Sequence, residues 1–149
     1  MSNLKVQGNA SGSGTTTLQS PNTSTSATIT LPDSTSADTL GYLNAPVNEQ
    51  SAAYTAVAAD AGKIIFHPST DANARTFTIP ANGSVAYATG TVLTFINMTS
   101  QVVTIAITTD TLYLAGTGST GSRSLAQYGI ATAVKMTSTT WLISGNGLT

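Results

Sequence analysis

Charged side chains are scarce in this sequence. Only 7% of the residues are Asp, Glu, Lys or Arg, against about 25% in a typical soluble domain. The formal net charge of -1 gives no electrostatic field that would attract nucleic acid or an anionic membrane surface. We therefore expect neither nucleic acid nor a membrane as a partner.

Cysteine is absent, and histidine occurs once. Without cysteine the chain can form neither a disulfide framework nor a thiolate metal site, so the redox compartment is left open. Residues 1–14 contain no apolar run typical of a signal peptide. No segment approaches the ~20 apolar residues that a membrane-spanning helix needs.

Serine and threonine take the place of charge and make up roughly 30% of the chain. Residues 76–109 contain no ionisable carboxylate, amine or imidazole, and apolar residues alternate there with hydroxyl residues at a period of two. This alternation is typical of β-strands. It indicates strands that serve packing and assembly.

Composition divides the chain near residue 50. The sequence predicts an N-terminal arm and strand pair over 1–50, with short strands at 16–19 and 27–31, and a glycine-rich link at 8–14. Residues 51–149 carry more large side chains and are expected to form a β-sandwich domain. The whole chain is long enough to enclose one hydrophobic core.

Short strands separated by turn residues recur along 51–149. They are expected at 63–66, 75–79 and 111–114, with hairpins at 91–97/102–107 and 130–136/140–144. In the last hairpin Ile130, Val134 and Met136 are expected to face inward. The pattern predicts an all-β fold, a jelly-roll-like sandwich or a small barrel with an extended N-terminal arm.

One glycine motif matches a dinucleotide-binding signature. The string GTGSTG at 116–121 follows an expected strand, but a dinucleotide site also needs a helix after the third glycine and an acidic residue about twenty positions later. Residues 122–136 look strand-like, and no Asp or Glu follows Asp110. We interpret the string as a loop and expect no cofactor.

Few residues could serve catalysis or bind metal. His67 is the only imidazole and lies at the end of an expected strand, where a polar structural role is the simpler interpretation. Asp60, Asp71 and Asp110 do not have calcium-loop spacing, and isolated carboxylates beside Gly or Asn more often form turns. A glycosidase with paired carboxylates would need an aromatic platform, whereas Trp141 is expected in the core. We expect no enzyme activity and no metal site.

Several strings resemble a module found in structural proteins of tailed bacteriophages. They are GYLNAP (41–46), ADAGK (59–63), HPSTDANART (67–76), TIPAN (78–82) and the ending from LAG (114–116) to WLISGNGLT (141–149). In addition, TLQSPNT (17–23) with ITLP (29–32) is similar to a strand pair of phage fibre and appendage proteins. The resemblance covers most of the chain. It implies a β-rich, trimeric virion protein and supplies no catalytic residues.

Capsid decoration, head-fibre and tail-fibre proteins share this module. Related tail fibres place it after long shaft repeats, whereas only a short arm precedes it here, so we expect a capsid decoration protein that contacts the major capsid protein or another virion protein. The expected contact residues lie in the arm: Leu4, Val6, Thr16, Leu18 and Gln19. A short tail-fibre or head-fibre component that contacts the host surface is the alternative. A glycan-binding or glycan-processing domain is a third reading, but the aromatic content of 6% does not favour it.

Overall fold

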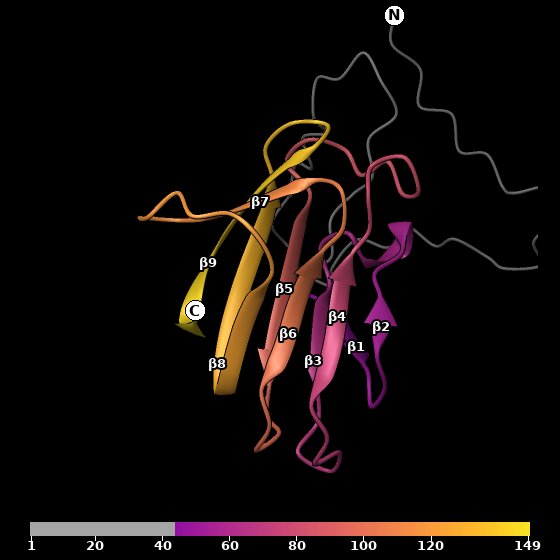
Figure 1. Cartoon of the computed structure of the whole chain (residues 1–149). Coiled ribbons are helices and arrows are strands. Elements are labelled where there is room, and N and C mark those ends of the chain that lie inside the picture. Colours follow the sequence, from indigo (N-terminus) through magenta and orange to yellow (C-terminus); the bar gives the residue numbers. More distant parts are fainter. Residues whose placement is uncertain (1–43) are drawn as a thin grey trace, which may run out of the picture. The chain divides into compact units, whose positions relative to one another are not determined.

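The computed structural model describes residues 44–149, which form an all-β structure without an α-helix (Figure 1). The predicted strands at 63–66, 75–79 and 111–114 are confirmed, with a shift of one residue in the first. The expected strands at 16–19 and 27–31 lie outside the described residues. The elements are β1 (Val47–Glu49), β2 (Tyr54–Thr55), the short 3-10 helix η1 (Ala58–Asp60), β3 (Ile64–His67), β4 (Arg75–Ile79), β5 (Val92–Asn97), β6 (Val103–Ile107), β7 (Thr111–Leu114), β8 (Arg123–Lys135) and β9 (Thr140–Leu148).

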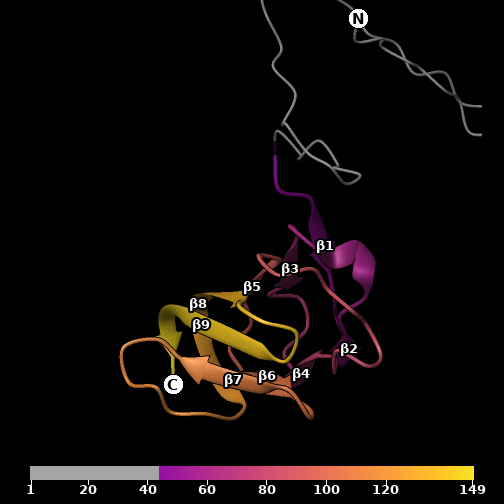
Figure 2. The ribbon, with the colours of Figure 1, turned by 90° about the horizontal axis from the view of Figure 1, so that it is seen from above.

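The first six strands alternate between two parallel stacks. β1, β3 and β5 pair side by side in one stack, and β2, β4 and β6 pair in the other. Figure 2 shows the two stacks as separate rows. Parallel neighbours need a crossover between them. Here each crossover contains a strand of the opposite stack, so the chain winds from one stack to the other and back.

The long strand β8 joins the two stacks. Its C-terminal half pairs antiparallel with β5, and its N-terminal end pairs antiparallel with β6. Strand β9 pairs antiparallel with β8, and β7 pairs parallel with β9. The β8/β9 register shifts between Leu125 and Ile130, and such a bulge bends a strand. The result is one mixed, curled sheet that forms a half-barrel.

The hydrophobic core lies inside the curl. Alternate residues of each strand point inward, as the period of two predicts. The fully buried large side chains come from both stacks and from the C-terminal strands, and they include Trp141, Phe77, Phe95, Ile65, Ile79, Leu93, Ile105, Leu112, Leu125 and Ile143. The expectation that Trp141 belongs to the core is confirmed.

The predicted hairpin over 91–97 and 102–107 is wrong. Strands β5 and β6 do not pair with each other, because both pair with β8, one after the other along its length. The residues between them form a corner that reverses the chain and carries it from one stack to the other, so the two strands run in opposite directions in different stacks (Figure 1). Asn97 holds this corner: its side-chain amide donates to the Gln101 carbonyl (2.8 Å) and to the Leu125 carbonyl of β8 (3.0 Å).

The predicted C-terminal hairpin is confirmed, but its inward face is not the expected one. Ile130 and Met136 are 46% and 50% exposed, and Val134 is only half-buried. The inward positions of β8 are instead occupied by small residues and one lysine: Ala131, Ala133 and Lys135. Residue size alone therefore does not decide which side chains of β8 point inward.

The strand connections also differ from those of a jelly roll. A jelly roll is built from antiparallel strands, whereas five of the eight strand pairings here are parallel. The sheet of the domain expected to begin at residue 51 also includes an earlier strand, because β1 pairs with β3.

Gly145 of β9 lies opposite Ala131 of the neighbouring strand β8, and the backbone of β8 leaves no room there for a side chain. A Cβ atom at this position would lie 2.2 Å from the Ile130 carbonyl oxygen and 2.6 Å from Ala131 Cα. We expect Gly145→Ala to lower the free energy of unfolding by about 1–3 kcal/mol or more, because the clash is with backbone that cannot rotate away. Urea denaturation measures the effect. Gly83→Ala, where a Cβ would meet no atom within 4 Å, is the control, and an equal loss in both variants would contradict the prediction.

Candidate interaction surface

The arm residues that the sequence nominates for partner contact lie outside the described residues. They are Leu4, Val6, Thr16, Leu18 and Gln19. The description of residues 44–149 therefore bears on the other candidates only.

His67 is confirmed at the end of a strand, and it is fully buried there. Its Nδ1 lies 2.8 Å from the Gln50 carbonyl oxygen, and its Nε2 lies 3.2 Å from the Asn73 carbonyl oxygen. The ring also packs edge-on against Phe77, with 5.8 Å between ring centroids. Both nitrogens are thus engaged with backbone at a corner between the stacks, which is a structural arrangement.

Asp71 holds the next part of the same corner. Arg75 donates from Nε to Asp71 Oδ2 (2.7 Å) and from Nη2 to Oδ1 (3.3 Å), and the Asn73 amide donates to Oδ1. The hydrogen bond from Arg75, followed by that from Asn73, lowers the pKa of Asp71 from 3.8 to about 2. The carboxylate is therefore charged at neutral pH and fixes the turn between β3 and β4.

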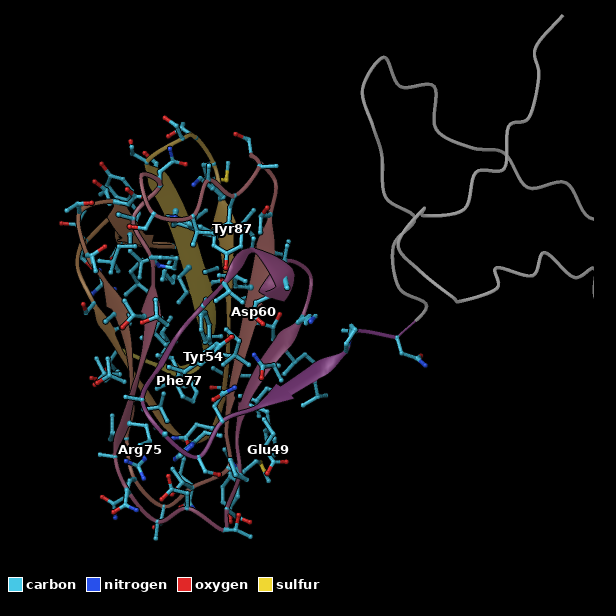
Figure 3. All side chains as sticks on the ribbon, turned by 90° about the vertical axis from the view of Figure 1, so that its right-hand side faces the viewer. Glu49, Tyr54, Asp60, Arg75, Phe77 and Tyr87 are labelled. Carbon is cyan, nitrogen blue, oxygen red and sulfur yellow. The ribbon has the colours of Figure 1, made fainter. Side chains whose placement is uncertain are left out.

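The Asp60 side chain links η1 to both β1 and β2 (Figure 3). Its Oδ2 accepts from the Tyr54 hydroxyl (2.7 Å) and the Val57 N–H (2.8 Å), and its Oδ1 accepts from the Asn48 amide (2.9 Å). Tyr87 donates to the Val57 carbonyl (2.6 Å). Burial raises the pKa of both tyrosines, and the Asp60 charge raises it further. The two hydroxyls therefore remain donors.

Asp60, Asp71 and Asp110 do not meet in space as metal ligands. Among residues 44–149 no three His, Cys, Asp or Glu side chains form such a group. Asp110 instead accepts the Asn82 N–H with both carboxylate oxygens, each at 3.2 Å. Asp71 and Asp60 thus hold a turn and a helix end, as expected for carboxylates at such positions, whereas Asp110 binds the backbone of a turn that is distant in sequence.

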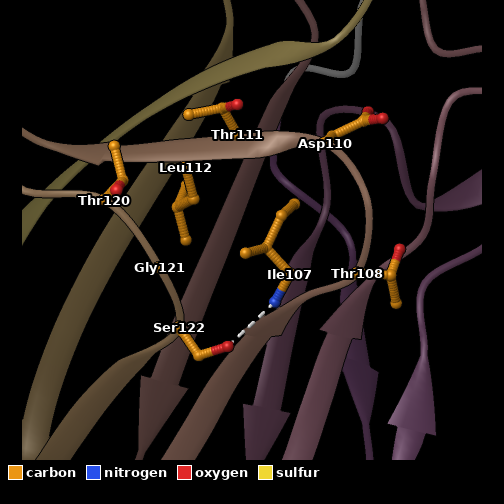
Figure 4. Close-up of a pocket in the computed structure, with 8 residues that line it drawn as sticks. All are labelled: Ile107, Thr108, Asp110, Thr111, Leu112, Thr120, Gly121 and Ser122. Carbon is orange, nitrogen blue, oxygen red and sulfur yellow. Dashed lines mark hydrogen bonds between the residues drawn. The ribbon is translucent and has the colours of Figure 1, made fainter.

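The GTGSTG string at 116–121 forms a loop, and strand β8 rather than a helix follows it. Gly116, Gly118 and Gly121 have positive φ angles, which glycine adopts without strain. Next to the loop is an open hollow of about 300 Å³, shown in Figure 4. Its lining is Ile107, Thr108, Asp110, Thr111, Leu112, Thr120, Gly121 and Ser122.

The hollow offers little for chemistry. The Asp110 carboxylate is 8% exposed and bound to Asn82, and the Ser122 hydroxyl accepts from the Ile107 N–H at 3.2 Å. The remaining polar groups of the lining are threonine hydroxyls and backbone. This arrangement holds a loop in place and contains no base paired with a nucleophile.

Lys135 is buried under the half-barrel's aromatic residues, which the sequence gives no reason to expect. The side chain is 1% exposed. Its ammonium donates to Asn82 Oδ1 at 2.8 Å and lies 5.3 Å from the Trp141 ring centroid and 6.0 Å from that of Tyr87. The aromatic faces and one amide oxygen therefore replace water around the charge.

The outer face of the first stack, together with β8 and β9, carries exposed apolar side chains. In-register rows across these strands place apolar side chains side by side: Phe66, Ile96 and Ile130 in one row, and Val92, Val134 and Leu142 in another. A row between them contains Ile64 followed by hydroxyl residues. We call this surface the apolar face and define it by Val47, Ile64, Phe66, Val92, Ile96, Ile130, Val134 and Leu142.

The outer face of the second stack has a different composition. Its rows contain Thr55, Thr78 and Ala106, and Thr76, Thr104 and Ser124. We call it the threonine face. Both outer faces alternate in the same way, yet only the first has large apolar side chains in its in-register rows; Val57 and Val102, each 47% exposed, lie just outside β2 and β6. Exposed apolar rows of this kind mark interaction surfaces.

Sequence reasoning locates part of this surface, because the uncharged alternating strands of 91–107 and of the C-terminal hairpin leave more apolar strand surface than a monomer of this size is expected to expose. The signal was present in β5, where Val92-Leu93 and Phe95-Ile96 place apolar residues at both parities of the strand. A strand that is apolar at both parities is typical of one packed on both faces. Within residues 44–149 the core covers one face of β5, and Val92 and Ile96 point away from it.

No protein-family model, curated protein or solved structure matches this chain. Within residues 44–149 no helix has the length and apolar character needed to cross a membrane.

The Asp71 contacts predict a pH dependence of stability. Because the folded pKa of about 2 lies below the ordinary aspartate pKa of 3.8, the contacts stabilise the fold above about pH 4, and this contribution is lost as the pH falls toward 2. We expect Asp71→Asn to be less stable than the parent at pH 6, with the difference shrinking between pH 4 and pH 2. Thermal unfolding at stepped pH values measures it. Glu49→Gln matches the change in net charge, and a pH-independent difference between the two variants would overturn the assignment.

The surroundings of Lys135 predict that removal of its amide partner, Asn82, lowers the free energy of unfolding. Asn82→Ala leaves a buried ammonium without its hydrogen-bond acceptor, so we expect a loss of about 1–3 kcal/mol in the free energy of unfolding. Lys135→Met with Asn82→Ala removes the charge as well and should recover part of the loss. Guanidinium denaturation of both variants gives the comparison. A double variant no more stable than Asn82→Ala would contradict the role of the charge.

Proposed function

We propose that this protein is a non-enzymatic structural component of a tailed-bacteriophage virion. More specifically, we propose that it is a capsid decoration protein that binds the shell as a homotrimer through its N-terminal arm. The motif resemblance supports the virion assignment. One of these strings, residues 67–76, forms the corner that His67, Asp71 and Arg75 hold. Its polar residues therefore have a structural role in the fold.

The observation that carries an assembly role is the uncharged apolar face. Glu49, at the β1 border, is the only ionisable side chain in its in-register rows, and Val47, Ile130 and Leu142 are 60%, 46% and 40% exposed. A surface of this kind gains free energy when another surface covers it. Proteins that assemble into large particles use such contacts.

The only imidazole supports the non-enzymatic part of the proposal. His67 has no exposed surface, and both of its nitrogens face backbone oxygens. A general base must reach the proton that it removes. A substrate would have to open the corner between β3 and β4 to reach this ring.

A short tail-fibre or head-fibre component is the second candidate, and Tyr128 favours it. This residue lies in the β8 bulge, is 70% exposed and has a φ angle of 59°. A large aromatic side chain in the left-handed region is strained, and such strain is retained at functional positions. An exposed tyrosine suits contact with a host-surface polymer. Cryo-electron microscopy of intact particles separates the candidates, since decoration gives hundreds of copies on the shell and a fibre gives a few.

The arm mechanism predicts that deleting residues 2–14 abolishes binding to undecorated capsids and leaves a folded trimer. Burial of Leu4 and Val6 would contribute roughly 3–6 kcal/mol per arm before ordering costs, and three linked arms act together through effective concentration. Co-sedimentation with capsids measures binding.

Matched substitutions sharpen this experiment. Leu4→Ala with Val6→Ala should weaken binding strongly, whereas Asn3→Ala with Gln7→Ala should not. Added salt should change little, because Lys5 is the only charge in residues 1–19. If the deleted protein still saturates capsids, or if binding collapses at high ionic strength, the arm is not the docking element.

A further inference from the structure

We infer that the apolar face is the subunit interface, at which this chain packs against other copies of itself. This inference rests on the proposed homotrimer and adds to it the surface that holds the copies together. The arm would then contact the shell, while the apolar face is buried inside the trimer.

The contrast between the two outer faces shows that solubility alone does not explain the apolar face. Thr76, Thr78 and Thr104 demonstrate that outward positions of these strands accept threonine. The corresponding positions of the other stack carry Phe66, Ile96 and Ile130. Because hydroxyl residues are so common in this chain, apolar rows that run across several paired strands on one side of the sheet indicate that this face is covered.

The size of the face matches a subunit interface. Five neighbouring strands span about 20 Å, and the outward residues from Val92 to Ile96 span about 13 Å along the strand. With the reach of the side chains, the face covers roughly 500–700 Å², close to the ~800 Å² that each partner contributes to a standard interface.

The absence of charge favours a second copy over an unrelated partner. In a cyclic trimer, side chains near the threefold axis meet their counterparts from the other two copies, so any charge there meets its own like charge. Within the in-register rows of β1, β3, β5, β8 and β9, the only ionisable outward residue is Glu49, at the β1 border. The middle row presents Thr94 and Thr132, whose hydroxyls lie 3.5 Å apart and can donate across the interface.

The test compares the oligomeric state of matched variants of the full chain by sedimentation velocity. Ile130→Asp with Leu142→Asp places carboxylates on exposed positions of the apolar face, and Thr76→Asp with Ser124→Asp does the same on the threonine face. We expect the parent and the threonine-face variant to sediment as trimers. The apolar-face variant should sediment as a monomer with unchanged circular dichroism, since each buried carboxylate weakens association about a hundredfold.

Cysteine cross-linking keeps the inference testable if the aspartate variant fails to fold. The chain has no cysteine of its own, so Ile130→Cys and Thr76→Cys each provide one reactive thiol. A short bis-maleimide linker should join copies through Ile130→Cys and not through Thr76→Cys. Cross-linking of Thr76→Cys alone would overturn the assignment.

The outcomes separate this inference from the proposed function. A monomeric parent, or an apolar-face variant that remains trimeric, overturns the interface. If that trimeric variant also loses binding to capsids, the face docks on the shell instead. A cross-linked trimer that is absent from purified particles leaves the interface standing and overturns the virion function.

Discussion

The half-barrel depends on the backbone hydrogen bonding of strand β8. The seven strands before it are two to six residues long, and strands this short are marginal as isolated pairs. β8 extends over thirteen residues and pairs with β5, β6 and β9. One continuous strand thus fixes the last member of each stack and the C-terminal strand together. Close backbone approach at Gly145 is the local requirement for this arrangement.

The sequence predicts where most strands lie and which residues face the core, because alternation is a local property. It does not predict which strands pair, since a period of two is the same in parallel and antiparallel neighbours. The error over β5 and β6 has this origin: both strands are present, but a corner held by Asn97 replaces the hairpin turn. On β8, residue size misled the assignment of faces, because Ile130 appears a better core residue than Ala131. The inward position of Lys135 depends on two aromatic rings: Trp141 lies on another strand, β9, and Tyr87 is distant in sequence.

The low charge content has a structural counterpart. Residues 44–149 contain eight charged side chains, and four of them are buried: Asp60, Asp71, Asp110 and Lys135. Three of these groups hold turns or the end of η1, and Lys135 lies between aromatic rings. The few charges of this part of the chain therefore serve its architecture as much as its solvation, and hydroxyl groups provide much of the polar surface. Sequence composition shows the scarcity of charge but cannot show that half of what is present lies inside.

In both stacks the strands become shorter toward the beginning of the described residues. Strand length falls from six residues in β5 to four in β3 and three in β1, and from five in β4 to two in β2. Many β-proteins prevent unwanted strand addition by placing lysine or another charge on the last strand. This chain has little charge to use. A last strand of two or three residues offers too few backbone groups to start a growing ribbon, so tapering limits fibre formation at this end of the sheet.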